Sequence, residues 1–258
     1  MKRIAVVFQE LKHKNESALI TYITAGYPTL DMSMRYIELF ANNGADMTEI
    51  GIPFSDPIAD GRTIQYASNI ALKNKANINS ILREISRLKV KNPLIIMSYL
   101  NPILAFGRRK FFQSISEAGV SGVIIPDLID EESAILKPFA KKNGVDIIQL
   151  VAPTSSNGRI KQIGQNSDAF VYCVSLTGTT GIKRRLPANL PAFIKRVRNL
   201  INKPLVVGFG ISRINQVNQL SRIADGVVIG SRIIEAIKRR EDLAKLIREF
   251  KDATKQGI

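Results

Sequence analysis

The chain has 258 residues, of which 45% are apolar and 23% charged, and its formal net charge at pH 7 is +15. This is the composition of a globular protein that is long enough to bury one large core. A single histidine and a single cysteine exclude disulfide frameworks within the chain and zinc sites built from Cys and His, so we expect no metal site.

The opening segment, residues 1–14, is too charged for a signal peptide and is predicted to form a short amphipathic helix. No apolar run reaches the roughly 18 residues that a membrane-spanning helix needs. Cys173 lies in an apolar run and is expected to be buried, whereas His13 lies in a basic stretch and is expected at the surface. Cysteine usage of this kind favours a reducing compartment, so we expect the protein in the cytoplasm.

The positive charge is spread over most of the predicted helices. Its three dense clusters, at residues 107–110, 183–185 and 238–240, are not interleaved with aromatic side chains, and the chain has no Trp. Single-stranded nucleic acids are normally bound on such aromatic platforms, so we expect binding neither to nucleic acid nor to a membrane. A phosphate-bearing substrate or an acidic partner surface would account for part of the charge.

Eight short runs are apolar almost throughout, mostly rich in β-branched residues and bounded by Gly, Pro, Asn or Asp. In chain order they cover residues 19–24, 47–52, 93–99, 122–127, 146–151, 169–175, 204–209 and 226–231. Continuous apolar runs of this length are typical of strands in a parallel sheet that is covered on both faces.

Amphipathic stretches that predict helices lie between these runs. They cover residues 30–45, a helix pair at 63–88, and then 130–145, 187–203, 214–224 and 231–255. Strands that alternate with helices in this way predict a (β/α)8 TIM barrel, formed by a single domain over residues 1–258, with the N-terminal helix lying across the bottom of the barrel. A doubly wound open sheet is the alternative fold.

Active residues of such barrels lie at the carboxyl ends of the strands and in the loops that follow. Glu49 is a carboxylate inside the second apolar run. If its side chain points inward, burial should raise its pKa and suit it to general acid/base catalysis near neutral pH. The alternatives are an ion pair within the barrel or a side chain that turns outward.

Two further acids follow in the next loop, which is rich in Pro and Gly. Asp60 precedes Gly61 and a predicted helix, so it is either a functional carboxylate or an ordinary N-cap. Asp56 and Pro57 together form a common turn signature, so Asp56 is either a functional carboxylate or only part of that turn.

Three glycine-rich turns follow the last three predicted strands. They are SLTGTTG at residues 175–181, GFGIS at 208–212, and the pair Gly230 and Ser231. Glycines let backbone N–H groups approach an anion, and helix N-termini favour its charge. Each turn alone could be only a tight connection, but three on neighbouring strands predict a phosphate site.

Aromatic side chains near the ends of the predicted strands could line a slot for a flat apolar group. These candidates are Tyr22, Tyr99, Tyr172 and Phe209. The alternative is that these rings only fill the core.

At this point the motifs resemble a known family. EIGIPFSDPIADGRTIQ at residues 49–65 is similar to the signature of the tryptophan synthase α subunit. Further motifs of that family follow in the same order, and they are TYITAGYPT, MSYLNPI, GVIIPDL, LVAPTS, YCVSLTGTTG, VGFGIS and ADGVVIGS. The first motif is highly specific, and the resemblance covers nearly the whole chain.

The resemblance implies a (β/α)8 barrel that cleaves indole-3-glycerol phosphate to indole and glyceraldehyde 3-phosphate without a cofactor. It also implies a partner, the β subunit, which carries pyridoxal phosphate and consumes the indole in an α2β2 heterotetramer. By motif, the catalytic acid/base falls on Glu49, and the carboxylate that binds the indole N–H falls on Asp60.

The remaining roles implied by the resemblance divide into two sets. Substrate binding falls on Tyr22, Tyr99, Tyr172, Thr180, Gly181, Phe209, Gly210, Gly230 and Ser231. Contact with the β subunit falls on Pro53, Asp56, Pro57 and Asn101.

Three positions depart from the family pattern. Arg62 and Ile129 stand where the family usually has Pro, and Leu176 stands where it usually has Arg. These changes affect loops and part of the partner surface but leave the two acids in place. Two alternatives therefore remain: a weakly active scaffold that mainly activates a β subunit, and a free-standing lyase that releases indole.

Overall fold

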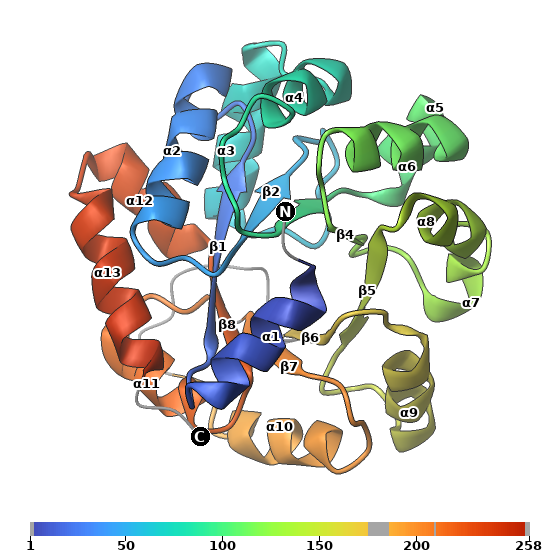
Figure 1. Ribbon diagram of the computed structural model, residues 1–258, viewed down its shortest axis with the longest axis vertical. Coiled ribbons are helices and arrows are strands. Elements are labelled where there is room, and N and C mark those ends of the chain that lie inside the picture. Colours follow the sequence, from blue (N-terminus) through green and yellow to red (C-terminus); the bar gives the residue numbers. More distant parts are fainter. Residues whose placement is uncertain (1–2, 175–185, 209, 256–258) are drawn as a thin grey trace.

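The computed structural model describes residues 3–174, 186–208 and 210–255 of the chain. Its centre is a closed barrel of parallel strands (Figure 1), in which every strand pairs with its neighbours in chain order and β1 also pairs with β8. The strands are β1 (Ala18–Thr24), β2 (Met47–Gly51), β3 (Leu94–Met97), β4 (Gly122–Ile124), β5 (Asp146–Val151), β6 (Val171–Val174), β7 (Leu205–Gly208) and β8 (Gly226–Ile229). The pairing of β1 with β8 confirms the predicted (β/α)8 barrel and excludes the open sheet.

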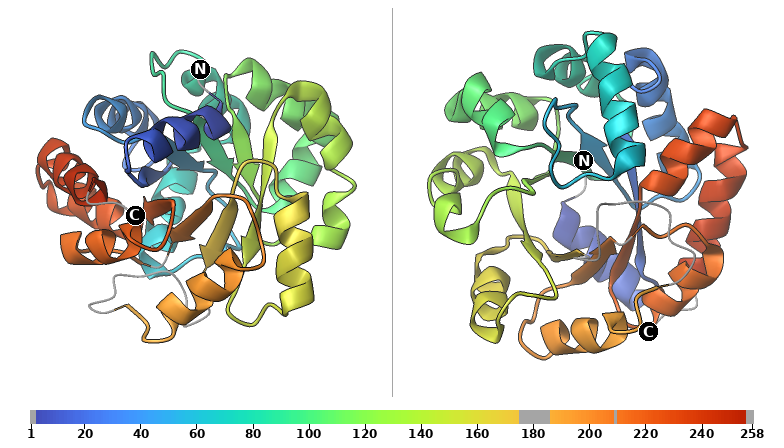
Figure 2. Two further views of the ribbon diagram at one scale, coloured as in Figure 1. Left: turned by 60° about the horizontal axis from the view of Figure 1, so that its bottom comes forward. Right: turned by 180° about the vertical axis from the view of Figure 1, so that it is seen from behind.

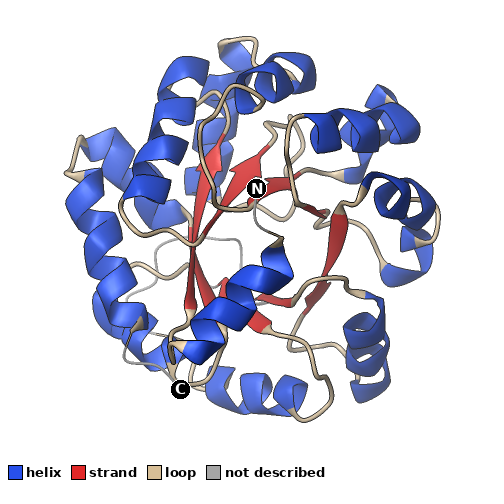
Figure 3. Ribbon diagram, in the orientation of Figure 1, coloured by secondary structure: helices blue, strands red, loops and turns tan. Residues whose placement is uncertain are grey.

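Helices surround the barrel, so that each strand is covered on its outer side (Figure 3). They are α1 (Ile4–His13), α2 (Leu30–Asn42), α3 (Arg62–Lys73), α4 (Ile78–Ile85), α5 (Leu100–Phe106), α6 (Arg108–Glu117), α7 (Asp130–Ser133), α8 (Lys137–Asn143), α9 (Asn157–Asn166), α10 (Leu190–Arg198), α11 (Ile214–Ser221), α12 (Ser231–Arg239) and α13 (Leu243–Thr254). Within the described part of the chain, none of these helices has both the length and the apolar character required to span a membrane.

Two predicted helices are each divided in the structure. The stretch 130–145 forms α7 and α8, and Pro138 lies in the first turn of α8, where proline is tolerated because the first N–H groups of a helix have no partner within it. The stretch 231–255 forms α12 and α13, because Arg240 adopts a left-handed conformation with a φ of 56° and ends α12.

Helix α1 lies across the N-terminal end of the barrel, as the sequence predicts (Figure 2). Ile4 is fully buried there, and a Cβ placed on Gly122 of β4 would lie only 2.9 Å from its Cδ1 atom. One turn later, the Phe8 ring packs edge-on against Phe170, with 5.6 Å between the ring centroids. The helix therefore closes the bottom of the barrel with apolar side chains.

The strand register decides which side chains face the interior. Residues that are paired across parallel strands point to the same side of the sheet. Tyr22 of β1 pairs with Glu49 of β2, and Glu49 pairs with Ile95 of β3. All three side chains are buried, and together they form part of one layer inside the barrel.

Three aspartates lock pairs of strands together at the N-terminal end of the barrel. Each lies shortly before an even-numbered strand, and its Oδ2 atom accepts a hydrogen bond of 2.7 Å from a backbone N–H of the preceding strand. The pairs are Asp46 with Leu19, Asp168 with Ile147, and Asp225 with Leu205. In each pair the aspartate N–H also donates to the carbonyl of the same partner.

Candidate active site

Glu49 lies inside the barrel on β2 and has no exposed surface. Neither of its carboxylate oxygens has a hydrogen-bond partner among the described residues, and none of the ion pairs found there includes it. Burial raises its pKa from 4.5 to about 8. The structure thus confirms the inward orientation and gives no support to the alternative of an ion pair within the barrel.

Asp60 lies in the loop after β2, and burial raises its pKa from 3.8 to about 6, while a hydrogen bond with Tyr99 lowers it. The residue that caps helix α3 is Gly61, which has no side chain to make a capping bond. The interpretation of Asp60 as an ordinary N-cap is therefore wrong. The loop is itself held in place, because the Ala59 N–H donates to the Tyr99 hydroxyl at 3.0 Å.

Two buried tyrosines, Tyr22 on β1 and Tyr172 on β6, accompany the acids. Burial raises the pKa of each hydroxyl well above 10. The next largest cause is a nearby carboxylate, Asp60 for Tyr22 and Glu49 for Tyr172. The structure therefore brings both acids and both hydroxyls, with Tyr99, into one site at the carboxyl end of the barrel.

Each of these tyrosine rings lies over a glycine at the end of a neighbouring strand. A Cβ built on Gly51 would lie 2.2 Å from the Tyr22 hydroxyl oxygen, and one built on Gly208 would lie 2.2 Å from that of Tyr172. No role for Gly51 was predicted from the sequence. A glycine that ends an apolar strand next to a strand bearing tyrosine is the signal that could have indicated it.

The predicted phosphate site is only partly described. Gly230 is the N-cap of α12, Ser231 is the first residue of that helix and is buried, and the first turn of α12 carries no acid. A Cβ on Gly230 would lie 3.3 Å from the Cβ of Tyr22, so this helix begins beside the site. Gly210 follows β7 with a φ of 63°. Thr180, Gly181, Phe209 and the departing residue Leu176 lie outside the described residues.

Three of the predicted partner residues, Pro53, Asp56 and Pro57, lie in the loop that follows β2, and the fourth, Asn101, lies at the start of helix α5, which follows β3. Asp56 and Asn101 are exposed, Pro57 is half-buried, and Pro53 is buried. Ile58, in the same loop, exposes 78% of its surface. Two departures from the family pattern, Arg62 at the start of α3 and Ile129 before α7, are also exposed, so neither disturbs the buried carboxyls.

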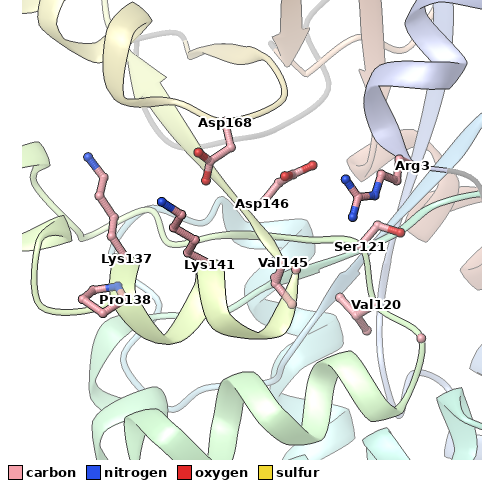
Figure 4. A pocket seen from close by; sticks show the side chains of 11 residues that line it. Arg3, Val120, Ser121, Lys137, Pro138, Lys141, Val145, Asp146 and Asp168 are labelled. Carbon is pink, nitrogen blue, oxygen red and sulfur yellow. The ribbon is translucent and has the colours of Figure 1, made fainter.

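A separate cavity of about 910 Å³ opens at the opposite end of the barrel, beside the start of β5 (Figure 4). Arg3, Lys137 and Lys141 surround it together with Asp146 and Asp168. Burial raises the pKa of the Asp146 carboxyl, and the neighbouring Asp168 adds to this effect. Because it opens at the N-terminal ends of the strands, this cavity has no part in the site around Glu49.

The closed barrel, with a buried carboxyl at the carboxyl end of its strands that has no partner among the described residues, defines an enzyme of the (β/α)8-barrel class. The sequence model of one family, described as tryptophan synthase alpha chain, matches residues 8–256. The chain belongs to the tryptophan synthase alpha chain family.

Individual relatives agree along the whole chain. A tryptophan synthase alpha chain of Geobacter sulfurreducens is 42% identical and covers 100% of this chain and 99% of its own length. That of Aquifex aeolicus is 41% identical, with 99% and 100% covered.

Solved structures are similar to the same extent. A structure of Mycobacterium tuberculosis tryptophan synthase superimposes with a TM-score of 0.93 at 31% identity, with 99% of both chains covered. The tryptophan synthase subunit alpha of Legionella pneumophila superimposes with a TM-score of 0.89 at 32% identity, with 98% of both chains covered.

Proposed function

We propose that this chain is a lyase that cleaves indole-3-glycerol phosphate to indole and glyceraldehyde 3-phosphate, with Glu49 as the general acid and base. The reaction is that of its family. The observation that supports the role of Glu49 is its place inside the barrel, where burial raises its pKa to about 8 and no described group pairs with it. A carboxyl in this state holds its proton at neutral pH and is able to donate it.

Glu49 acts twice in the proposed mechanism. It first gives its proton to C3 of the indole ring, and the resulting carboxylate then takes the proton of the hydroxyl on the adjacent side-chain carbon. As the bond between the two carbons breaks, its electron pair returns to the ring, and the hydroxyl-bearing carbon becomes the aldehyde carbon of the product. The carboxyl is thereby returned to its protonated form, so the cycle consumes no co-reactant.

Asp60 has the complementary task. Protonation at C3 places positive charge on the ring nitrogen, and an ionised carboxylate stabilises that charge where it develops. The pKa of Asp60, at about 6, lies below that of Glu49, at about 8. Near pH 7 Asp60 is therefore ionised while Glu49 holds its proton, and these are the two protonation states that the reaction requires.

The remaining predicted residues bind the substrate in this proposal. Tyr22, Tyr99, Tyr172 and Phe209 enclose the indole ring, and Thr180 closes over Asp60. Gly181, Gly210, Gly230 and Ser231 bind the phosphate through backbone N–H groups. Binding energy from the phosphate, which is remote from the breaking bond, helps to position the carbon atoms that react.

The partner in this proposal is a tryptophan synthase β subunit, with which the chain forms an α2β2 heterotetramer. Support comes from the family, whose members normally pair with a β subunit, and from two exposed residues, Asp56 in the loop after β2 and Asn101 in α5. Pyridoxal phosphate then belongs to the β subunit alone. A complex of this biosynthetic kind is expected in the cytoplasm.

Turnover of indole-3-glycerol phosphate by wild-type chain and by Glu49→Gln, each with and without a β subunit, tests the proposal. Gln keeps the shape of the side chain but cannot donate or accept the proton, so we expect a loss of at least about 10²-fold in kcat. An unchanged rate would reject the role of Glu49. Stimulation of the wild type by the β subunit is expected, and a lack of it would favour a free-standing lyase.

A further inference from the structure

Tyr22 is confined on several sides inside the barrel. It exposes 7% of its surface, and it is the direct neighbour of Glu49 across the β1–β2 pairing. Its hydroxyl oxygen lies 3.3 Å from the Thr24 Oγ1 atom on the same strand. On another side, a Cβ placed on Gly230 would lie 3.3 Å from its Cβ and 3.4 Å from its Cδ1. The ring therefore has little room to move toward β8.

The end of the Tyr22 ring occupies the space above Gly51, the last residue of β2. A Cβ on Gly51 would lie 2.2 Å from the hydroxyl oxygen, 2.8 Å from Cζ and 3.0 Å from Cε2 of Tyr22. Real side chains do not approach so closely, so any larger residue at this position would displace the ring. Gly51 has no positive φ, and its backbone therefore does not itself require glycine. The requirement comes from Tyr22.

The site that is affected lies two residues earlier on the same strand. Glu49 and Gly51 both face the interior of β2, because side chains alternate along a strand. Tyr22 pairs with Glu49 across the two strands, and the Glu49 carboxylate is near enough to raise the pKa of the Tyr22 hydroxyl, so the ring lies beside the carboxyl on the side of β1. A ring in this place keeps water from the carboxyl and fixes its direction, and both effects matter for a group that must meet a carbon atom and a hydroxyl in turn.

We propose that Gly51 is a positioning residue for the reaction, because its missing side chain makes the space in which Tyr22 covers Glu49. This inference rests on the proposed function of Glu49. It adds that the identity of residue 51 is coupled to that of residue 22. Gly51 acts on the chemistry only through the tyrosine and does not need to touch the substrate.

The test compares Gly51→Ala in two backgrounds, the wild type and Tyr22→Leu. In the wild type the added methyl displaces the ring, and we expect kcat to fall about tenfold or more, since small misplacements at a reacting group are costly. In Tyr22→Leu the space above residue 51 is empty, so the same alanine should change kcat by less than about twofold. Equal losses in both backgrounds would overturn the proposal.

Two further variants separate positioning from a general loss of packing. Gly164 is a glycine of α9 that is equally crowded, because its Cβ would lie 2.3 Å from Ile201 Cγ2, but it lies outside the site. Gly164→Ala should lower the melting temperature without changing kcat. If Tyr22→Leu is itself too slow to measure, Tyr22→Phe removes the closest contact at 2.2 Å, and the effect of the alanine should shrink in that background.

The pH profile supplies a readout that a purely structural role would not move. Displacement of the ring admits water to Glu49, so the alkaline limb of kcat/KM in Gly51→Ala should lie below that of the wild type. An unchanged limb would count against the proposal. If the wild-type chain does not cleave the substrate at all, the proposed function fails. The role of Gly51 fails on its own if the wild type is active but Gly51→Ala lowers kcat equally in the wild type and in Tyr22→Leu.

Discussion

Glu49 and Asp60 belong to one short motif, but the barrel gives them different surroundings. Glu49 is fully enclosed on β2, and Asp60 lies in the following loop, where the Tyr99 hydroxyl bonds to it. Burial dominates both pKa values, and the hydrogen bond partly offsets it for Asp60 alone. The pKa of Glu49, at about 8, therefore exceeds that of Asp60, at about 6, because the two side chains have different surroundings and not because one is Glu and the other Asp.

The first prediction at this scale concerns the rate. Activity needs ionised Asp60 and protonated Glu49, so kcat/KM should be bell-shaped, with limbs near pH 6 and pH 8. Tyr99→Phe removes the hydrogen bond that lowers the pKa of Asp60, so the acidic limb should move to higher pH while the alkaline limb stays. Steady-state kinetics of both proteins across this range would check it, and an acidic limb that does not move would contradict the assignment.

The second prediction concerns stability. Because the pKa of Glu49 is about 8 in the folded state and 4.5 in its ordinary state, the folded protein holds a proton that the unfolded chain releases. Stability must therefore fall as the pH rises from 4.5 to 8. Glu49→Gln has no such proton, so it should gain about 3 kcal/mol relative to wild type between about pH 5 and pH 7.

Urea unfolding of both proteins at several pH values would measure this gain. The contributions of Asp60 and of all other titratable groups are common to both proteins and largely cancel in the difference. A constant difference across the range would show that Glu49 is ionised in the folded state.

The sequence predicted the two acids but not all of their surroundings. The apolar run around Glu49 suggested a buried carboxyl with a raised pKa, but it left open an ion pair within the barrel or a side chain that turns outward. Whether Asp60 capped a helix could not be decided, because Asp60 and Gly61 are both acceptable N-cap residues. The contact between Gly51 and Tyr22 joins two strands whose register the sequence leaves open, so only the folded barrel shows it.

At the scale of strands and helices, the repeated aspartates show how the barrel is fastened at its N-terminal end. Asp46, Asp168 and Asp225 each exchange two hydrogen bonds with one residue of the preceding strand. Ser121 occupies the corresponding place before β4, and its N–H donates to the Leu94 carbonyl at 2.8 Å. An aspartate thus joins β1 to β2, β5 to β6 and β7 to β8 in the same way, whereas β3 and β4 are joined without one.

Asp225 offers a test of this fastening. Asp225→Ala leaves the Leu205 N–H without its acceptor at 2.7 Å and should cost about 1 to 3 kcal/mol of the free energy of unfolding. Asp225→Asn keeps an acceptor oxygen and loses the charge opposite Arg198, which is 39% exposed, so it should cost less than about 1 kcal/mol. Chemical denaturation would measure both, and equal costs would show that the ion pair, not the backbone bond, matters.

Helix boundaries were the least predictable feature at this scale. The stretches 130–145 and 231–255 each have the composition of one helix, yet each forms two. The turn at Arg240 puts a non-glycine residue in the left-handed region, which local sequence preference disfavours. The packing of α12 and α13 around a closed barrel decides the break.

At the scale of the whole molecule, the two ends of the barrel have separate roles. Glu49 and Asp60 face the carboxyl ends of the strands, whereas α1 and the three aspartates lie at the other end. This separation is typical of the fold and lets stability and chemistry change independently. That residues 1–258 form a single domain stays a prediction.

A substitution in α1 tests the separation. Ile4→Ala leaves a cavity between α1 and Gly122 of β4 and should cost about 2 to 4 kcal/mol of stability. Because the site lies at the far end, kcat should change by less than about twofold. Val6→Ala, on the same helix but 40% exposed, is the matched control and should have little effect on either quantity. A large loss of kcat in Ile4→Ala at temperatures where it is folded would contradict the separation.

The sequence by itself determined the alternation of strands and helices, the class of fold and the position of both acids in one motif. The reason is that the spacing of apolar residues and the choice of turn residues are local features of the sequence. Only the tertiary structure decided the closure of β1 on β8, the burial of Glu49 away from any partner in the described part of the chain, and the space that Gly51 leaves for Tyr22. These features depend on residues that are far apart in sequence and on side-chain volumes in contact. They arise from the packing of side chains in a closed barrel, and a local sequence pattern does not specify that packing.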